Sequence, residues 1–160
     1  AESGTQKVLD FIGKSTTLER VSKAVKTVKQ SGLKVLASFI IGVPGETVRM
    51  IKDTIKFAEK LNPTYAQFTI CTPYPGTRLF AIAKEKGLLI TKDWRRYTTV
   101  EPIMNIPGIS AEQLRKLLNR AYISFYLRPR YVLSELLNRR FFIIKKAISG
   151  ALDYYRALKN

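Results

Sequence analysis

The stretch Phe39-Ile40-Ile41-Gly42-Val43-Pro44-Gly45-Glu46-Thr47 decides the fold of this chain, because an apolar run stops abruptly at a Gly-x-Pro-Gly turn. Short apolar runs bounded by Gly and Pro are typical of buried parallel strands. Residues 34–41 form such a run, and residues 47–61 have the apolar spacing of a helix. The stretch therefore predicts a strand–turn–helix unit, whose turn lies where α/β proteins bind ligands.

A second unit of the same kind follows directly. The apolar run 65–71 predicts a strand, Thr72-Pro73-Tyr74-Pro75-Gly76-Thr77 predicts a rigid turn, and residues 78–86 predict a short helix that ends at Gly87. Two consecutive units of this kind predict a parallel sheet with right-handed crossovers, so both turns should open on one edge. Two strands are too few for a stable sheet. We therefore expect the chain either to pair with itself or to continue strands that precede Ala1.

Helix signals flank these two units. Thr16-x-x-Glu19 is a capping box, which predicts the start of a helix that ends at Ser31-Gly32. Ser110-x-x-Gln113 predicts a helix to about residue 127, and Pro129 separates it from a further helical stretch. The expected organisation is a half-barrel of βα units (1–90), an irregular connection (91–109) and a helical C-terminal extension (110–160).

The composition excludes several kinds of chemistry. There is no histidine, so imidazole catalysis and histidine metal ligation are excluded. The single Cys71 excludes a disulfide framework, and by itself it cannot hold an iron–sulfur cluster. We expect Cys71 to be a small buried hydrophobic residue rather than a nucleophile. Neither catalytic nor metal-binding residues are predicted, and the expected location is the cytoplasm.

The chain is strongly basic, with a net charge of +16. Residues 81–160 hold 16 Lys and Arg against 6 acidic residues. Such an excess favours anionic partners, although a lysine-rich thermophile surface has the same composition. Basic and aromatic residues are mixed in 125–131 and 138–146. These segments predict either a surface for nucleic acid or an anionic membrane, with peripheral membrane association, or a helical hairpin that packs its aromatic rings.

The first turn has two interpretations. Gly42 lets the backbone approach a ligand closely, Pro44-Gly45 sets a tight turn, and Glu46 is expected in the first turn of the helix, against its positive end. The alternative is a purely structural turn. In the second turn, Tyr74 could stack on a flat ligand, or the loop could simply be rigid.

With these motifs, the chain resembles the C-terminal half of a radical S-adenosylmethionine (SAM) protein, closest to the subgroup with a cobalamin-binding domain. The resemblance is carried by Glu2-Ser3-Gly4 with Val8-Leu9, by 41–47, by 72–77 and by 125–129. It implies a partial (β/α)6, TIM-barrel-like fold, in which 34–41 and 65–71 are the fifth and sixth strands. The cofactors implied are SAM, a [4Fe–4S] cluster and cobalamin.

The resemblance also implies roles for particular residues. Glu2 and Ser3 would lie near the ribose or methionine part of SAM, and Ile41, Gly42 and Pro44 would form the apolar edge for the adenine. Thr72, Pro73 and Tyr74 would border the cofactor or substrate, and Gly45 and Glu46 complete the predicted binding set.

The chain departs from the family in lacking the Cys-x3-Cys-x2-Cys motif that binds the cluster. The resemblance therefore implies a fragment that is inert alone and whose partner is the N-terminal half of the same protein. An exposed half-barrel edge would also favour self-association. The parent would be a methyltransferase or cyclase. Two alternatives remain open: part of a radical SAM tRNA methylthiotransferase, or a basic helical module that binds nucleic acid or an anionic membrane.

Overall fold

The computed structural model describes residues 1–137, and the chain divides into two compact units, residues 1–118 and 119–160. The first unit is a mixed α/β structure. It contains α1 (Gln6–Phe11), α2 (Leu18–Gln30), β1 (Leu36–Ile41), α3 (Val48–Leu61), β2 (Tyr65–Ile70), α4 (Arg78–Glu85) and the 3-10 helix η1 (Trp94–Arg96). Helix α5 (Ala111–Tyr126) crosses the division, and α6 (Pro129–Leu137) belongs to the second unit.

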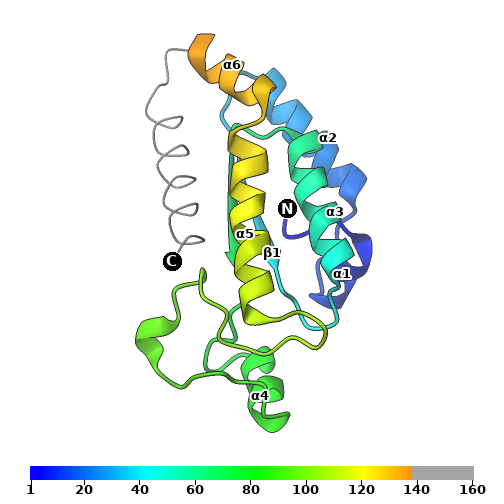
Figure 1. The fold of residues 1–160 in the computed structure, drawn as a ribbon. Coiled ribbons are helices and arrows are strands. Elements are labelled where there is room, and N and C mark those ends of the chain that lie inside the picture. Colours follow the sequence, from blue (N-terminus) through cyan, green and yellow to red (C-terminus); the bar gives the residue numbers. More distant parts are fainter. Residues whose placement is uncertain (138–160) are drawn as a thin grey trace, which may run out of the picture. The chain divides into compact units, whose positions relative to one another are not determined.

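The two strands form a parallel sheet, as the two successive βα units predict. They pair in register from Leu36 with Tyr65 to Ile41 with Ile70. The amide of Cys71 then donates to the carbonyl of Ile41 at 2.8 Å, so pairing continues to the end of both strands. Figure 1 shows α4 and the loop after it at the carboxyl ends of the strands. The two glycine–proline turns therefore leave the same edge of the sheet.

The prediction of fully buried strands is wrong for one face of the sheet. Burial alternates along both strands, and the stacked rings of Phe39 and Phe68, 5.3 Å apart, lie at the centre of the buried face. The opposite row includes Leu36, Ser38 and Gln67, all of which are exposed among the described residues. Alternation is expected where only one face of a sheet is covered. The apolar composition of the run alone does not reveal how many faces are covered.

Threonine hydroxyls cap α2, α3 and α4. The hydroxyl of Thr17, not Thr16, accepts the amide of Arg20, so the predicted capping box is one residue too early. Thr47 and Thr77 cap α3 and α4 in the same way. A threonine at this position satisfies one of the free amides of the first turn, typically contributing about 1 kcal/mol. The caps fix where each turn ends and each helix begins.

The N-terminal segment is attached to both β1 and α3. The carbonyl of Glu2 accepts the amide of Ile40 at 2.8 Å, so this segment lies beside β1. A Cβ atom added to Gly4 would lie 2.6 Å from the Cα atom of Thr54 and 2.6 Å from the Cβ atom of Phe57. Only glycine allows this close contact with α3.

The described part of the second unit is an aromatic cluster. Phe125 and Tyr131 are buried, and their ring centres are 5.5 Å apart. The guanidinium of Arg128 lies 4.1 Å from the centre of the Phe125 ring, a cation–π arrangement. Aromatic residues in 125–131 therefore pack against one another, as the second of the two interpretations of this segment predicts. The basic stretch 138–146 lies outside the described residues.

The structure contains two short helices that the sequence did not predict, α1 and η1, the latter within the region expected to be irregular. Helices α5 and α6 agree with the predicted pair, and Ser110 caps the first of them, as expected, by accepting the amide of Gln113. In the part of the chain that the structure describes, no helix is both long enough and apolar enough to cross a lipid bilayer.

Candidate functional site

The candidate site consists of turn one (residues 42–47) and turn two (residues 72–77), which follow β1 and β2. Because Ile41 and Ile70 are register partners, the two turns begin side by side. Each turn leads into a helix through a threonine cap. The arrangement brings two rigid loops and two helix N-termini to one edge, which is the usual position of ligand sites in α/β proteins.

The carboxylate of Glu46 organises turn one. Its Oε2 atom accepts the amide of Gly42 at 2.7 Å and the amide of Val43 at 3.1 Å. The prediction that Glu46 lies in the first turn of the helix is wrong, because α3 begins at Val48 after the cap Thr47. Glu46 instead folds back on the strand end, where its Oε2 atom accepts these two amides. The amides that a ligand would need at Gly42 and Val43 are therefore already used within the chain.

Burial changes the acidity of this carboxyl. Glu46 is only 2% exposed, and this burial raises its pKa from 4.5 to about 7, although the amides of Val43 and Gly42 favour the charged form. Its second oxygen, Oε1, is buried without a hydrogen-bond partner among the described residues. An unpaired buried acceptor is unfavourable unless it is protonated or meets a donor. Glu46 thus keeps one unpaired oxygen, which is buried and is not reached from the surface.

Side chains of the chain itself cover part of turn one. A Cβ atom on Gly42 would lie 2.8 Å from a methyl of Leu114 and 2.9 Å from the terminal methyl of Ile106. The close approach predicted at Gly42 therefore occurs, but these two side chains make it. Ile41 is fully buried, whereas Pro44 is half-buried and Gly45 exposed. The accessible part of turn one is the Pro44–Gly45 tip.

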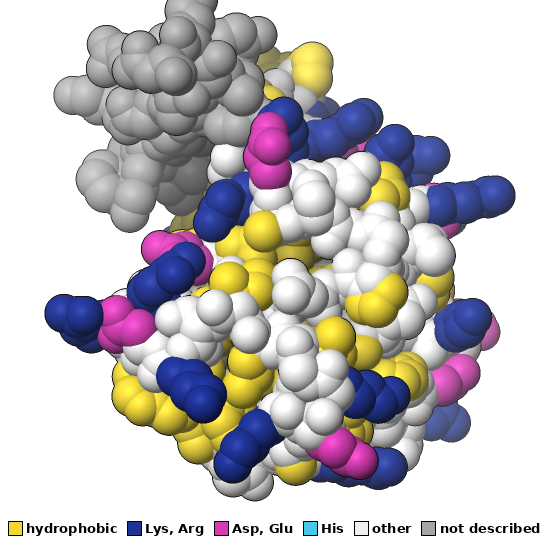
Figure 2. All heavy atoms as spheres, turned by 60° about the horizontal axis from the view of Figure 1, so that its bottom comes forward, with side chains coloured by type: hydrophobic (Ala, Val, Ile, Leu, Met, Phe, Trp, Pro, Cys, Tyr) yellow, Lys and Arg dark blue, Asp and Glu magenta, His cyan; other side chains and the backbone are white. Residues whose placement is uncertain are grey.

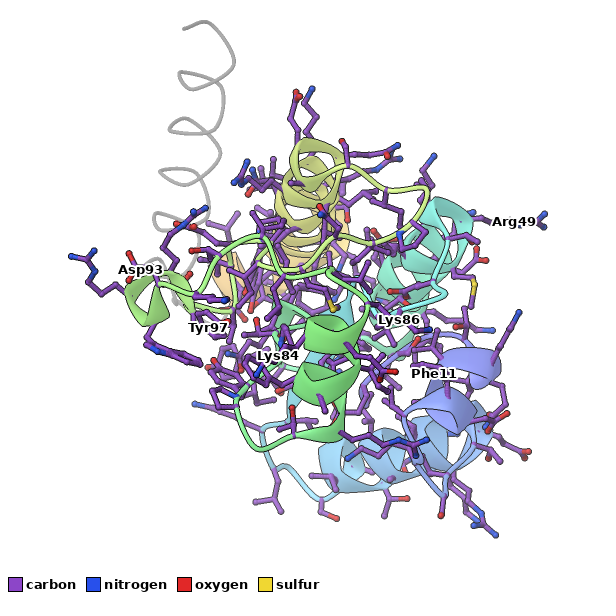
Figure 3. All side chains as sticks on the ribbon, turned by 90° about the horizontal axis from the view of Figure 1, so that it is seen from below. Phe11, Arg49, Lys84, Lys86, Asp93 and Tyr97 are labelled. Carbon is purple, nitrogen blue, oxygen red and sulfur yellow. The ribbon has the colours of Figure 1, made fainter. Side chains whose placement is uncertain are left out.

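Turn two is more open and is tied to a later loop. Thr72 is half-buried and Tyr74 is 43% exposed, while Pro73 is buried. The Tyr74 hydroxyl donates to the carbonyl of Tyr97 at 3.3 Å, and the two rings are 6.0 Å apart. Tyr97 lies in the loop that carries Asp93, and Figure 3 shows both labels on the side of α4 away from Phe11. Sequence reasoning missed this loop, because its aromatic residues follow no periodic pattern.

The predicted residues of the N-terminal segment have partners within the chain. The Glu2 carboxylate forms an ion pair with Lys14 at 3.0 Å, and the Ser3 hydroxyl lies 3.1 Å from that of Thr54. Ser3 is buried and anchors the segment to α3. Glu2 lies beside the end of β1, because its carbonyl accepts the amide of Ile40.

Cys71 is half-buried rather than fully buried, and its thiol has the low reactivity that is expected of a non-nucleophilic cysteine. Burial, with a smaller effect of the nearby Glu46 carboxylate, raises the pKa of its thiol to about 12. The thiolate is the reactive form, so this cysteine is a poor nucleophile and metal ligand at neutral pH. No group of three or more acidic or cysteine side chains that could hold a metal occurs within residues 1–137.

Comparison with known proteins identifies the family. Residues 1–58 match the model of the Radical SAM superfamily. The chain is 52% identical to an uncharacterized methyltransferase of Pyrococcus horikoshii, over 98% of the chain and 34% of that protein. It is 29% identical to an anaerobic magnesium-protoporphyrin IX monomethyl ester cyclase of Rubrivivax gelatinosus, over 82% of the chain and 23% of that protein. It is 25% identical to a bacteriochlorophyllide d C-8(2)-methyltransferase of Chlorobaculum tepidum, over 87% of the chain and 31% of that protein.

The chain belongs to the radical SAM superfamily. It spans about a third, or less, of the length of these three relatives. Membership of the superfamily implies SAM and a [4Fe–4S] cluster as cofactors. The matched segment, residues 1–58, includes the N-terminal attachment, β1, turn one and most of α3.

Proposed function

We propose that this chain supplies the C-terminal βα units of a partial (β/α)6 barrel in a cobalamin-linked radical SAM enzyme. Turn one and turn two would form part of the binding surface for SAM, which we call the ledge. One observation carries the proposal: the in-register parallel pairing of β1 and β2 brings both turns to one edge. The carbonyl of Glu2 accepts the amide of Ile40, so the N-terminal segment lies beside β1. A further strand before Glu2 would extend this sheet toward a barrel.

The accessible residues of turn one and turn two define the proposed contacts with SAM. The Pro44–Gly45 tip and the half-buried Thr72 offer a rigid, largely apolar border, and Tyr74 offers an exposed ring face. Oε1 of Glu46 is a buried acceptor without a hydrogen-bond partner among the described residues. A flat adenine ring matches an apolar border of this kind. These residues would orient SAM and exclude water from it.

SAM and a [4Fe–4S] cluster, when bound, would together supply radical chemistry at an unreactive carbon. The cluster needs cysteine ligands, and the sequence has one cysteine, so those ligands belong to another segment. The N-terminal half of the same protein is the partner proposed to supply them. Methyl transfer or ring closure is the proposed outcome, because the relatives are named methyltransferases and a cyclase.

The tRNA methylthiotransferase alternative is less favoured. It predicts strands after the half-barrel units, whereas the described residues 111–126 and 129–137 are helical. The membrane alternative depends on the basic stretch 138–146, which lies outside the described residues, and stays a prediction. Cosedimentation with anionic vesicles at low salt is the measurement that checks it.

Hydrogen exchange tests the proposed ledge. A longer protein that contains this chain, with its cluster reconstituted under anaerobic conditions, is compared with and without SAM. Peptides that cover turn one and turn two should exchange more slowly with SAM, whereas α2, on another part of the first unit, serves as the control and should not change. Formation of 5′-deoxyadenosine is measured in the same samples. SAM binding without protection of either turn would contradict the assignment.

A further inference from the structure

A connected set of aromatic rings lies beside turn two, and we call it the aromatic ladder: Tyr74, Tyr97, Trp94 and Phe80. Successive ring centres are 6.0, 4.7 and 6.2 Å apart, and their planes are tilted by 55°, 44° and 31°. The rings come from turn two, from the loop that contains η1 and from α4, so three segments converge on it. The superfamily match, which ends at residue 58, does not extend to the ladder.

The ladder is too exposed to serve packing alone. Trp94 is 54% exposed and Tyr74 is 43% exposed, and the neighbouring segment adds Val100, which is 50% exposed. Figure 2 turns α4 and the following loop forward, and hydrophobic side chains gather on this face with Lys and Arg around them. Clustered exposed apolar side chains with a polar border commonly mark a binding surface.

Positive charge lies next to the rings. Lys84 follows Phe80 by four residues on α4, so the two share a helix face, and Phe80 contacts Trp94. Figure 3 shows Lys84 on the side of α4 toward Tyr97. Lys92 precedes Trp94 by two residues. Neither lysine forms an ion pair within residues 1–137, whereas the nearby Arg95 is paired with Asp93.

We propose that the aromatic ladder binds single-stranded nucleic acid, with bases stacked on Trp94 and Tyr74 and phosphates near Lys84 and Lys92. The angles between the ring planes determine which shape of ligand can stack on the ladder. Rings tilted by 31–55° do not form one flat platform, so a large rigid plate can lie on only one of them. Successive bases joined by a flexible backbone can meet separate rings, and aromatic residues beside cations are the usual way to hold a single strand. The net charge of +16 favours the same partner.

The inference deepens the proposed function by naming a substrate class, because turn two is shared by the ladder and the proposed ledge. Binding of the strand itself needs neither SAM nor the cluster. A failure of strand binding therefore leaves the hydrogen-exchange result untouched, and the reverse also holds.

The 160-residue chain and a labelled single strand of about 12 pyrimidine nucleotides are the components of the test. Trp94 is the only tryptophan in the sequence, so its fluorescence reports directly on stacking at the ladder. The strand should quench Trp94 in a saturable manner. Anisotropy of the labelled strand should show that Trp94→Ala weakens binding by about 5- to 140-fold, which corresponds to ~1–3 kcal/mol for one base–aromatic stack.

Matched controls separate stacking from general attraction. Phe11 is 63% exposed on α1, and Figure 3 shows it away from Tyr97, so Phe11→Ala should leave binding unchanged. The double variant of Lys84 and Lys92 to alanine should reduce the slope of log K against log salt by about 1.4 for two lost phosphate contacts. The same change at Lys52 and Lys56, exposed on α3, should leave the slope unchanged.

Three outcomes would overturn the inference. One is strand binding that leaves Trp94 fluorescence unchanged. Another is equal loss of affinity in the Trp94 and Phe11 variants. The last is equal or stronger quenching by a duplex of the same sequence, by cytidine monophosphate or by a soluble carboxylated porphyrin, because each of these would point to another ligand class.

Discussion

The pH dependence of stability tests the role of Glu46, because burial raises its pKa from 4.5 to about 7. A carboxyl with a raised folded-state pKa binds its proton more tightly in the folded state. Its stabilising contribution is therefore fully present below the unfolded pKa of 4.5 and is lost as the pH rises through about 7. At about 1.4 kcal/mol per pKa unit, the total is about 3 kcal/mol, of which about 2 kcal/mol disappears between about pH 5 and pH 7.5.

Glu46→Gln removes this titration while keeping an oxygen that can accept the amides of Gly42 and Val43. Urea unfolding followed by circular dichroism gives the free energy of unfolding of both proteins at the two pH values. The wild type should lose about 2 kcal/mol more than the Gln variant on going to the higher pH, because all other carboxyls contribute equally to both. An equal pH dependence of the two proteins would show that Glu46 is not a buried, proton-binding group, and the account of turn one would be wrong.

Two further predictions follow from the same region. Gly42→Ala should destabilise the chain by about 2 kcal/mol or more, because its Cβ atom would meet Leu114 and Ile106 within 3 Å and φ is +78°. Gly45→Ala, with φ +82° and nothing within 4 Å, should cost only about 1 kcal/mol. Thermal unfolding compares the two variants, and equal losses would rule out crowding at Gly42. Cys71 should resist alkylation at about pH 8 in the folded chain and react readily in urea, since its thiol pKa is about 12 in the folded chain. Rapid labelling of the folded chain would contradict this raised pKa.

The superfamily and the main elements could be recognised from local patterns. Runs of apolar residues that stop at Gly and Pro predicted both strands, and the segments that follow the two turns were predicted as α3 and α4 to within a residue or two. The ledge was also predictable in outline, because consecutive βα units place their turns on one edge. These inferences depend only on neighbouring residues and on the handedness of the chain.

Long-range contacts decided the rest. Whether Glu46 interacts with the helix or with the strand end depends on which amides lie nearer once the chain has turned. The side chains that cover Gly42 belong to residues more than 60 positions later in the sequence. The ladder joins Tyr74 to Tyr97 across an irregular loop. Local sequence thus determined the strands, turns and helices of this protein, because hydrogen bonds and sterics within a few residues govern them. Only tertiary packing decided which turn is covered and which stays open, because that depends on side chains brought together from distant segments.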